Sequence, residues 1–181
     1  MTRALARIEA LFAALAALIL LFVMAAVSVD VVMRYVFNRP LGWTYDLISL
    51  YLMTALFYLV LSRTFAEGAH ISVDILEGRF PPAVRRVCHF VVDLLSAGLF
   101  AVITWLVAGR SLDDYVTGAA TAGEVLWPTW LSEVLVPIGT ALLTARLLLH
   151  AALHLGSLFT DRALIELPPP AGSAVAKGGF E

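Results

Sequence analysis

The sequence predicts an all-α integral membrane protein with four transmembrane helices. Of its 181 residues, 61% are hydrophobic and 14% are charged, whereas soluble domains are about a quarter charged. The mean hydropathy is +0.90. Four separate runs are long enough to cross a bilayer, which takes about 20 mostly apolar residues. A bilayer is therefore the natural solvent for this chain.

The first two helices are expected over about residues 9–36 and 43–64. Two early arginines give the first run the positive start of a secretory signal, but the run is longer than the core of such a signal. We therefore expect a helix that is retained. Asp46 lies near the start of the second helix.

The third and fourth helices are expected over about residues 83–110 and 125–152. Residues 113–123, rich in Gly, Ala and Thr, are expected to form the loop between them. Pro137 lies inside the fourth helix and predicts a kink or a local loosening. Residues 161–181, with their Pro and Gly, predict a flexible cytoplasmic tail.

Positive charge predicts the orientation. With both termini in the cytoplasm, nine Lys and Arg residues lie inside and three lie outside, as the positive-inside rule favours. Tryptophans would then mark the outer boundary, where amphipathic rings prefer to lie; they are Trp43, Trp127 and Trp130.

The segment between the second and third helices predicts a short amphipathic element. Ile71, Ile75 and Leu76 have the spacing of one helix face, and His70 and Asp74 would share another. Such an element can lie in the membrane interface. A solvated loop and a contact with a partner both fit this pattern.

Charged residues within membrane segments are functional candidates, since they are costly there. Asp30 and Arg34 share a helix face near Asp46. The three could fix the hairpin as an ion cluster, dock an external partner, or pass ions. Asp93 and Arg146 are expected at similar depth and predicted to pair, with a proton relay as the alternative.

Two further sets of polar residues leave alternatives open. Glu133 could pair with Arg34 or with Arg110. Arg146, His150 and His154, spaced four apart, form a stripe that could contact anionic lipid headgroups. The second interpretation of this stripe is haem ligation, with His89 as the other axial ligand.

The sequence offers little to other classes of function. A net charge of -2 gives no electrostatic case for nucleic acid. No phosphate-binding loop, hydrolase elbow or zinc-protease motif is present, so we expect no catalytic site, no metal and no cofactor.

Two motifs carry a resemblance to a known family. The first is Arg34-Tyr35-Val36-Phe37-Asn38-Arg39-Pro40-Leu41-Gly42-Trp43, followed by Asp46, and the second is Gly68-Ala69-His70-Ile71-Ser72-Val73-Asp74. In this order, and with the Pro137-Ile138-Gly139 step, they resemble the small membrane subunit, of DctQ type, of tripartite ATP-independent periplasmic (TRAP) transporters. The likeness covers about residues 8–155. The family's carboxylate pair after the tryptophan is reduced here to Asp46, which puts any role needing two acids in doubt.

The resemblance implies a non-catalytic scaffold in the bacterial inner membrane. Such a subunit is clamped against a large multi-span subunit that carries the substrate and sodium sites. A periplasmic solute-binding protein captures the substrate, often an organic acid, and an ion gradient drives uptake. The resemblance places the motif of Arg34, Asn38, Pro40, Trp43 and Asp46 near that periplasmic partner. His70 and Asp74 would lie on the cytoplasmic side.

Two other classes of protein stay open on the sequence alone. A haem-bearing anchor subunit of a respiratory oxidoreductase would use His89 with His150 or His154. A stand-alone channel or carrier would need more polar residues in its helices than this chain has.

Overall fold

Four long membrane-spanning segments make up the part of the chain that the structure describes, as the sequence predicts. The structure, a computed structural model, describes residues 2–68, 80–121 and 125–159. All four helices are long and apolar enough to cross a membrane. In chain order the elements are α1 (Thr2–Val36), α2 (Gly42–Asp46), the π-helix η1 (Leu47–Leu52), α3 (Met53–Ala66), α4 (Pro82–Thr117), α5 (Thr129–Glu133) and α6 (Leu135–Phe159). The expected amphipathic segment, with His70 and Asp74, and the tail lie outside the described residues.

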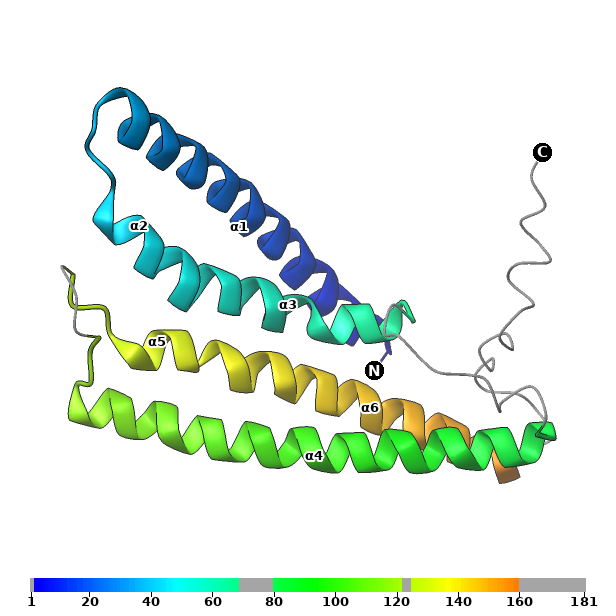
Figure 1. Ribbon diagram of the computed structural model, residues 1–181. Coiled ribbons are helices and arrows are strands. Elements are labelled where there is room, and N and C mark those ends of the chain that lie inside the picture. Colours follow the sequence, from blue (N-terminus) through cyan, green and yellow to red (C-terminus); the bar gives the residue numbers. More distant parts are fainter. Residues whose placement is uncertain (1, 69–79, 122–124, 160–181) are drawn as a thin grey trace, which may run out of the picture.

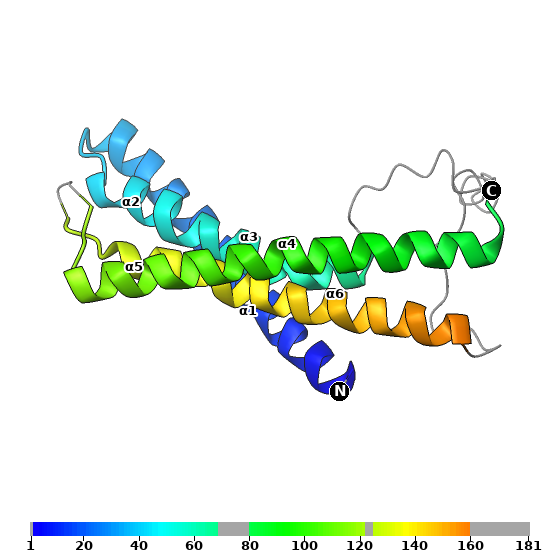
Figure 2. The same cartoon turned by 90° about the horizontal axis from the view of Figure 1, so that it is seen from below.

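The helices pack as an open row in the order α1, α3, α6, α4 (Figure 1). Each helix contacts chiefly its neighbours in this row, so α3 and α6 form the centre and α1 and α4 form the edges. α4 and α6 run side by side in both views, whereas α1 crosses them at an angle (Figure 2). We call the end of the row that holds the start of α1 the N-terminal end, and the other the opposite end.

The turn between α1 and α2 depends on Asn38. Its φ of 49° lies in the left-handed region, which asparagine tolerates better than most residues. This turn of the chain lets the amides of Phe37 and Arg39 both donate to the carbonyl of Met33, at 3.2 and 3.1 Å. The otherwise unpaired end of α1 is thereby closed, and the chain enters α2 after Pro40.

Two of the helices contain an irregular turn. η1 joins α2 to α3 without a gap, and the amide of Met53 donates to the carbonyl of Ile48, the five-residue spacing of a π-helix. Between α5 and α6, Val134 leaves the helical pattern, and its carbonyl accepts from the Ile138 amide at a long 3.4 Å. Because Pro137 has no N–H and its ring crowds the preceding turn, this loosening is the one that the sequence predicts.

α4 is longer than expected. It runs to Thr117 and ends at Gly118, whose φ of 65° is the usual left-handed end of a helix. The expected loop of residues 113–123 is therefore wrong at its start. Polar residues alone do not end a helix; the glycine five residues later does.

The centre of the row is a close crossing of α3 and α6. At Gly139 the backbones meet so closely that an added Cβ would lie 2.2 Å from the carbonyl oxygen of Tyr58. A small residue allows this close approach. In a bilayer the lipid tails are as apolar as the helices, so helix association depends on van der Waals contact, which close approach increases. Around it, one buried cluster joins three helices through Leu61, Ala97, Leu143 and Leu147.

Candidate functional site

The hairpin at the opposite end is held by one carboxylate. Asp30 accepts a hydrogen bond from Arg34 through Oδ2 and another from the amide of Leu41 through Oδ1, both at 2.8 Å. Leu41 lies beyond the turn, so Asp30 links the last part of α1 to the start of α2. Asp46 forms no ion pair or side-chain hydrogen bond with any described residue. Of the expected ion cluster, only the pair of Asp30 with Arg34 is present, and the Leu41 amide takes the third place.

The remaining motif residues surround this link without joining it. Asn38 and Pro40 are exposed on the turn, and Trp43 is partly exposed at the start of α2. Tyr35, Phe37 and Tyr45 expose most of their rings beside them. The motif thus combines one internal fastening, at Asp30, with an exposed aromatic surface whose role in docking stays a prediction.

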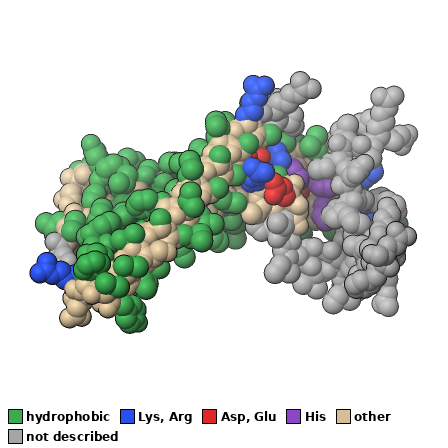
Figure 3. Space-filling view, turned by 90° about the horizontal axis from the view of Figure 1, so that it is seen from above, with side chains coloured by type: hydrophobic (Ala, Val, Ile, Leu, Met, Phe, Trp, Pro, Cys, Tyr) green, Lys and Arg blue, Asp and Glu red, His purple; other side chains and the backbone are tan. Residues whose placement is uncertain are grey.

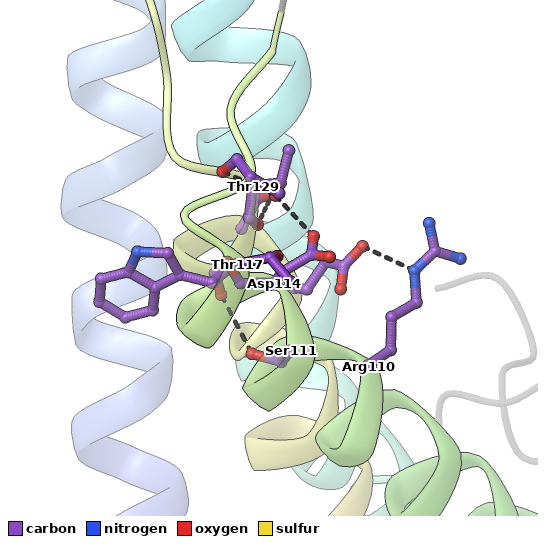
Figure 4. A network of polar contacts seen from close by, with 9 residues as sticks. Arg110, Ser111, Asp114, Thr117 and Thr129 are labelled. Carbon is purple, nitrogen blue, oxygen red and sulfur yellow. Dashed lines mark hydrogen bonds and ion pairs between the residues drawn. The ribbon is translucent and has the colours of Figure 1, made fainter.

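A second polar network fixes α5 against α4 at the same end of the row (Figure 4). Arg110 lies 3.1 Å from Glu133, which decides between the two partners that the sequence left open. Thr129 donates to Asp114 at 2.5 Å, and Ser111 donates to the carbonyl of Trp130 at 3.2 Å. Asp114 therefore takes part in holding α5 against α4.

Tyr51 joins the two halves of the protein at this end. Its hydroxyl donates to the carbonyl of Pro128 at 2.5 Å, and its ring lies against that of Trp127, with centroids 5.6 Å apart. The link ties η1 to the segment that starts α5. Sequence reasoning missed it, since a tyrosine inside an apolar run gives no signal of its partner.

Arg146 pairs with Glu9, not with Asp93. The two side chains are 15% and 5% exposed, and Arg146 Nε lies 3.7 Å from Glu9 Oε1. Ser62 donates to the same carboxylate oxygen at 2.6 Å. This cluster joins α1, α3 and α6 near the N-terminal end. Glu9 was overlooked as a partner because it lies where the first apolar run begins.

Asp93 lies beside His154 instead of Arg146, because Arg146 lies at a different level along α6. Its Oδ2 lies 3.9 Å from Nε2 of His154, which is about 12 Å further along α6 than Arg146 at 1.5 Å per residue. Antiparallel packing of α4 and α6 sets this level: Thr104 bonds to Thr140 near the middle, and Arg86 donates to the carbonyl of Ser157 at the end. The predicted Asp93–Arg146 pair is therefore wrong.

The sequence predicts that the basic stripe on α6 contacts lipid headgroups, but the structure packs its two histidines against other helices. His154 is buried and its ring stacks on that of His89, with centroids 5.4 Å apart and planes 13° from parallel. His150 packs against the ring of Phe65 at 5.1 Å. Figure 3 shows the histidines and acidic side chains close together, with basic side chains beside them, on a largely apolar surface.

The stacked imidazoles do not fit the haem hypothesis. Axial ligands of one iron aim the in-plane lone pairs of their nitrogens at each other across the metal. Stacked rings direct those lone pairs sideways, and Nε2 of His154 faces Asp93. No set of three His, Cys, Asp or Glu side chains within the described ranges could hold a metal ion.

The comparisons with known proteins now give this arrangement a family. Residues 23–156 match the model of the DctQ component of tripartite ATP-independent periplasmic transporters. The chain belongs to the DctQ family. A Haemophilus influenzae protein, named as a candidate TRAP transporter small permease protein, is 29% identical over 126 residues, covering 67% of this chain and 76% of that protein. No solved structure matches the chain.

Membership makes this chain a small TRAP permease subunit, as its sequence motifs predict. DctQ proteins are components of a transporter that works with a large transport subunit and a binding protein. The matched region includes the hairpin at Asp30, the Gly139 crossing and the polar network that holds α5 against α4. It begins after Glu9, so one member of the cluster of Glu9, Ser62 and Arg146 lies outside the matched region.

Proposed function

We propose that this DctQ subunit is the static scaffold of a transporter that imports an organic carboxylate across the bacterial inner membrane. Uptake is driven by an ion gradient, and the substrate passes through the large subunit. The N-terminal end of the row and both termini face the cytoplasm. The opposite end faces the periplasm and helps to dock the solute-binding protein.

The open row of helices is the observation that carries this proposal. Within an 18-residue apolar window of each candidate span, the share of residues buried in the chain is 6% for α1 and 11% for α4, against 28% and 33% for the two central spans. A lone membrane protein can cover such faces with lipid, but an open row whose two edge helices are so little buried within the chain also suits a subunit held against a larger partner. We therefore assign the edges to the large subunit and to lipid.

The distribution of polar groups argues against a substrate path through this chain. The described ion pairs lie toward the two ends, and between them the α4–α6 contact is made by Phe100, Leu143, Leu147 and a threonine pair. A carboxylate in transit needs cationic or hydrogen-bonding groups along its route. Arg146, whose side chain is 15% exposed, is already opposed by Glu9.

The exposed motif at the opposite end supports the docking role. Arg39 is exposed, Asp46 is half-buried without an ion-pair partner in the described chain, and Tyr45 exposes 78% of its surface. Charges of both signs beside aromatic rings suit a polar, reversible protein contact. Asp30, by contrast, already accepts hydrogen bonds within the hairpin.

Reconstitution tests the proposal. This chain, its large subunit and its binding protein are placed together in proteoliposomes, and uptake of labelled organic acids is followed with and without a sodium gradient. Uptake should need all three proteins and the gradient. Uptake by this chain alone would refute the scaffold role, and gradient-independent uptake would refute the coupling.

A second measurement tests the orientation. Single cysteines replace Arg39 or Arg7, with Cys88 changed to Ser, and an impermeant maleimide is applied to whole cells. Labelling at position 39 and protection at position 7 are expected, and the reverse pattern would overturn the assignment.

A further inference from the structure

One tryptophan of α4 lies outside the packed part of the protein. Trp105 exposes 80% of its surface, and its indole N–H donates to no described residue. The preceding residue, Thr104, faces α6 and bonds to Thr140 at 2.8 Å. Trp105 therefore lies at the level of that bond but outside the contact between α4 and α6.

The depth of Trp105 is unusual for this side chain. Trp43, Trp127 and Trp130 lie at the opposite end of the row, where amphipathic rings meet polar headgroups. Ser111, whose hydroxyl donates to the carbonyl of Trp130, marks that level on α4. Trp105 lies six residues before Ser111, about 9 Å deeper at 1.5 Å per residue. In the hydrocarbon layer neither water nor acyl chains can accept a hydrogen bond from the indole.

Two glycines share the face of α4 that holds Trp105. Gly98 lies seven residues before it and Gly109 four residues after it, spacings that keep all three on one side of a helix. An added Cβ at either glycine meets no atom within 4 Å. Packing within the chain therefore does not explain two residues that each cost a helix about 1 kcal/mol relative to alanine. Close approach by a helix from outside would explain them, as the internal crossing explains Gly139.

The other edge helix has neither feature. α1 contains no glycine and no tryptophan between Thr2 and Val36. The residues exposed along its apolar length are chiefly leucine, valine and alanine. Acyl chains can cover such a surface without leaving a polar group unpaired. The two edges of the row therefore differ, and it is α4 that presents a hydrogen-bond donor which lipid cannot satisfy.

We propose that the face of α4 around Gly98, Trp105 and Gly109 is the contact with the large subunit, and that α1 faces lipid. The partner is a transmembrane helix whose backbone comes close at the glycines. It offers the indole an oxygen acceptor, either a serine or threonine hydroxyl or a backbone carbonyl freed by a proline. Donor and acceptor are then complementary at the centre of the contact, where tryptophan contributes most to binding. The inference rests on the proposed function, because it takes the large subunit as the partner.

Photo-crosslinking in native membranes tests which edge meets the large subunit. The photoreactive residue p-benzoylphenylalanine replaces Val102, which is 56% exposed on the proposed face of α4. In the matched control it replaces Leu18, which is 64% exposed on α1. Irradiation should join the large subunit to position 102 and not to position 18. Adducts with the large subunit at position 18 and none at position 102 would overturn the inference.

Association of the two subunits in liposomes tests Trp105 itself. Energy transfer between fluorescent tags on the subunits is followed as the bilayer is diluted with lipid. Trp105→Leu should raise the apparent dissociation constant roughly thirtyfold, as the loss of a central tryptophan does at other interfaces. Gly98→Leu should also raise it, because the added side chain holds the partner helix away. Phe22→Leu, a matched change of a half-exposed aromatic residue on α1, should leave it unchanged.

Unfolding of the isolated chain separates binding from folding. Trp105→Leu and Gly98→Leu should leave its stability nearly unchanged, since neither position packs against the rest of the chain. A Trp105→Leu chain that binds the large subunit as tightly as the unaltered chain would refute the role of this face.

The two proposals can fail separately. Uptake that needs the large subunit, with crosslinks and losses of affinity that map to α1, would leave the scaffold role standing and overturn the assignment of α4. A chain that binds the large subunit through α4 but imports solute without it would refute the scaffold role and leave this contact standing.

Discussion

Replacing Gly139 by Ala should destabilise the protein, although the same change normally favours a helix. A Cβ at this position would lie 2.2 Å from the backbone oxygen of Tyr58 and 2.7 Å from its carbonyl carbon and Cβ. Two of these three atoms belong to the backbone, so no change of side-chain rotamer can relieve the clash. The two central helices must separate instead.

The size of the effect follows from that separation. Ordinary contact begins near 3.4 Å, so the Tyr58 carbonyl and the new methyl group must move apart by about 1.2 Å. One turn away, the Ser62 hydroxyl lies 3.5 Å from the Leu142 carbonyl, and this weak contact would be lost. Overpacking of this kind costs about 1–3 kcal/mol, against a gain of up to about 1 kcal/mol from helix propensity. We expect a net loss of about 1–2 kcal/mol.

Reversible unfolding in mixed detergent micelles, followed by circular dichroism, measures this loss. Gly98→Ala is the matched control, because Gly98 lies within α4 and an added Cβ there meets no atom within 4 Å. The control should be neutral or slightly stabilised. If Gly139→Ala unfolds at the same denaturant level as Gly98→Ala, then α3 and α6 do not cross as closely as described, and the argument fails.

Further substitutions test three of the polar links by the same unfolding measurement. Glu9→Gln and Arg146→Gln should each cost about 3 kcal/mol by leaving a buried charge unpaired, while the double variant should cost clearly less than the sum; additive losses would show that the two do not interact. Tyr51→Phe should cost about 1–2 kcal/mol, because it strands the carbonyl of Pro128, and exchange of backbone amides in α5 should rise; unchanged exchange would contradict the link. Asp30→Ala should cost about 1 kcal/mol more than Asp30→Asn, because only the latter keeps an acceptor for the hairpin amide; equal losses would show that the amide contact contributes nothing.

The helices themselves could be predicted from the sequence, since hydropathy alone decides what can cross a bilayer. Two local features could also be predicted. Pro137 predicted the loosened turn that appears at Val134, and the spacing of Asp30 and Arg34 predicted a shared face. These features depend on residues within one or two turns of each other, so the pattern contains all the information that they need.

The partners of buried charges could not be predicted in the same way. Arg146 meets Glu9 because α1 and α6 both contact α3, and nothing in the chain specifies that order of helices. Asp93 meets His154 because the register of α4 on α6 is set by contacts such as Thr104 with Thr140. Assigning depth by counting residues from each loop placed Asp93 and Arg146 together, and the unequal lengths of the helices made that count misleading.

The arrangement of these links explains how an open row of helices keeps one shape. A closed bundle fixes each helix through two or more neighbours, whereas α1 has α3 as its main neighbour and α4 has α6. Each edge helix is instead fastened toward both of its ends: α1 by Glu9 and Asp30, and α4 by Arg110 and Asp93. Polar contacts are directional, so they fix register and rotation where apolar packing against one neighbour would allow sliding. The apolar middle of each edge helix then presents a defined face, as the proposed scaffold role requires.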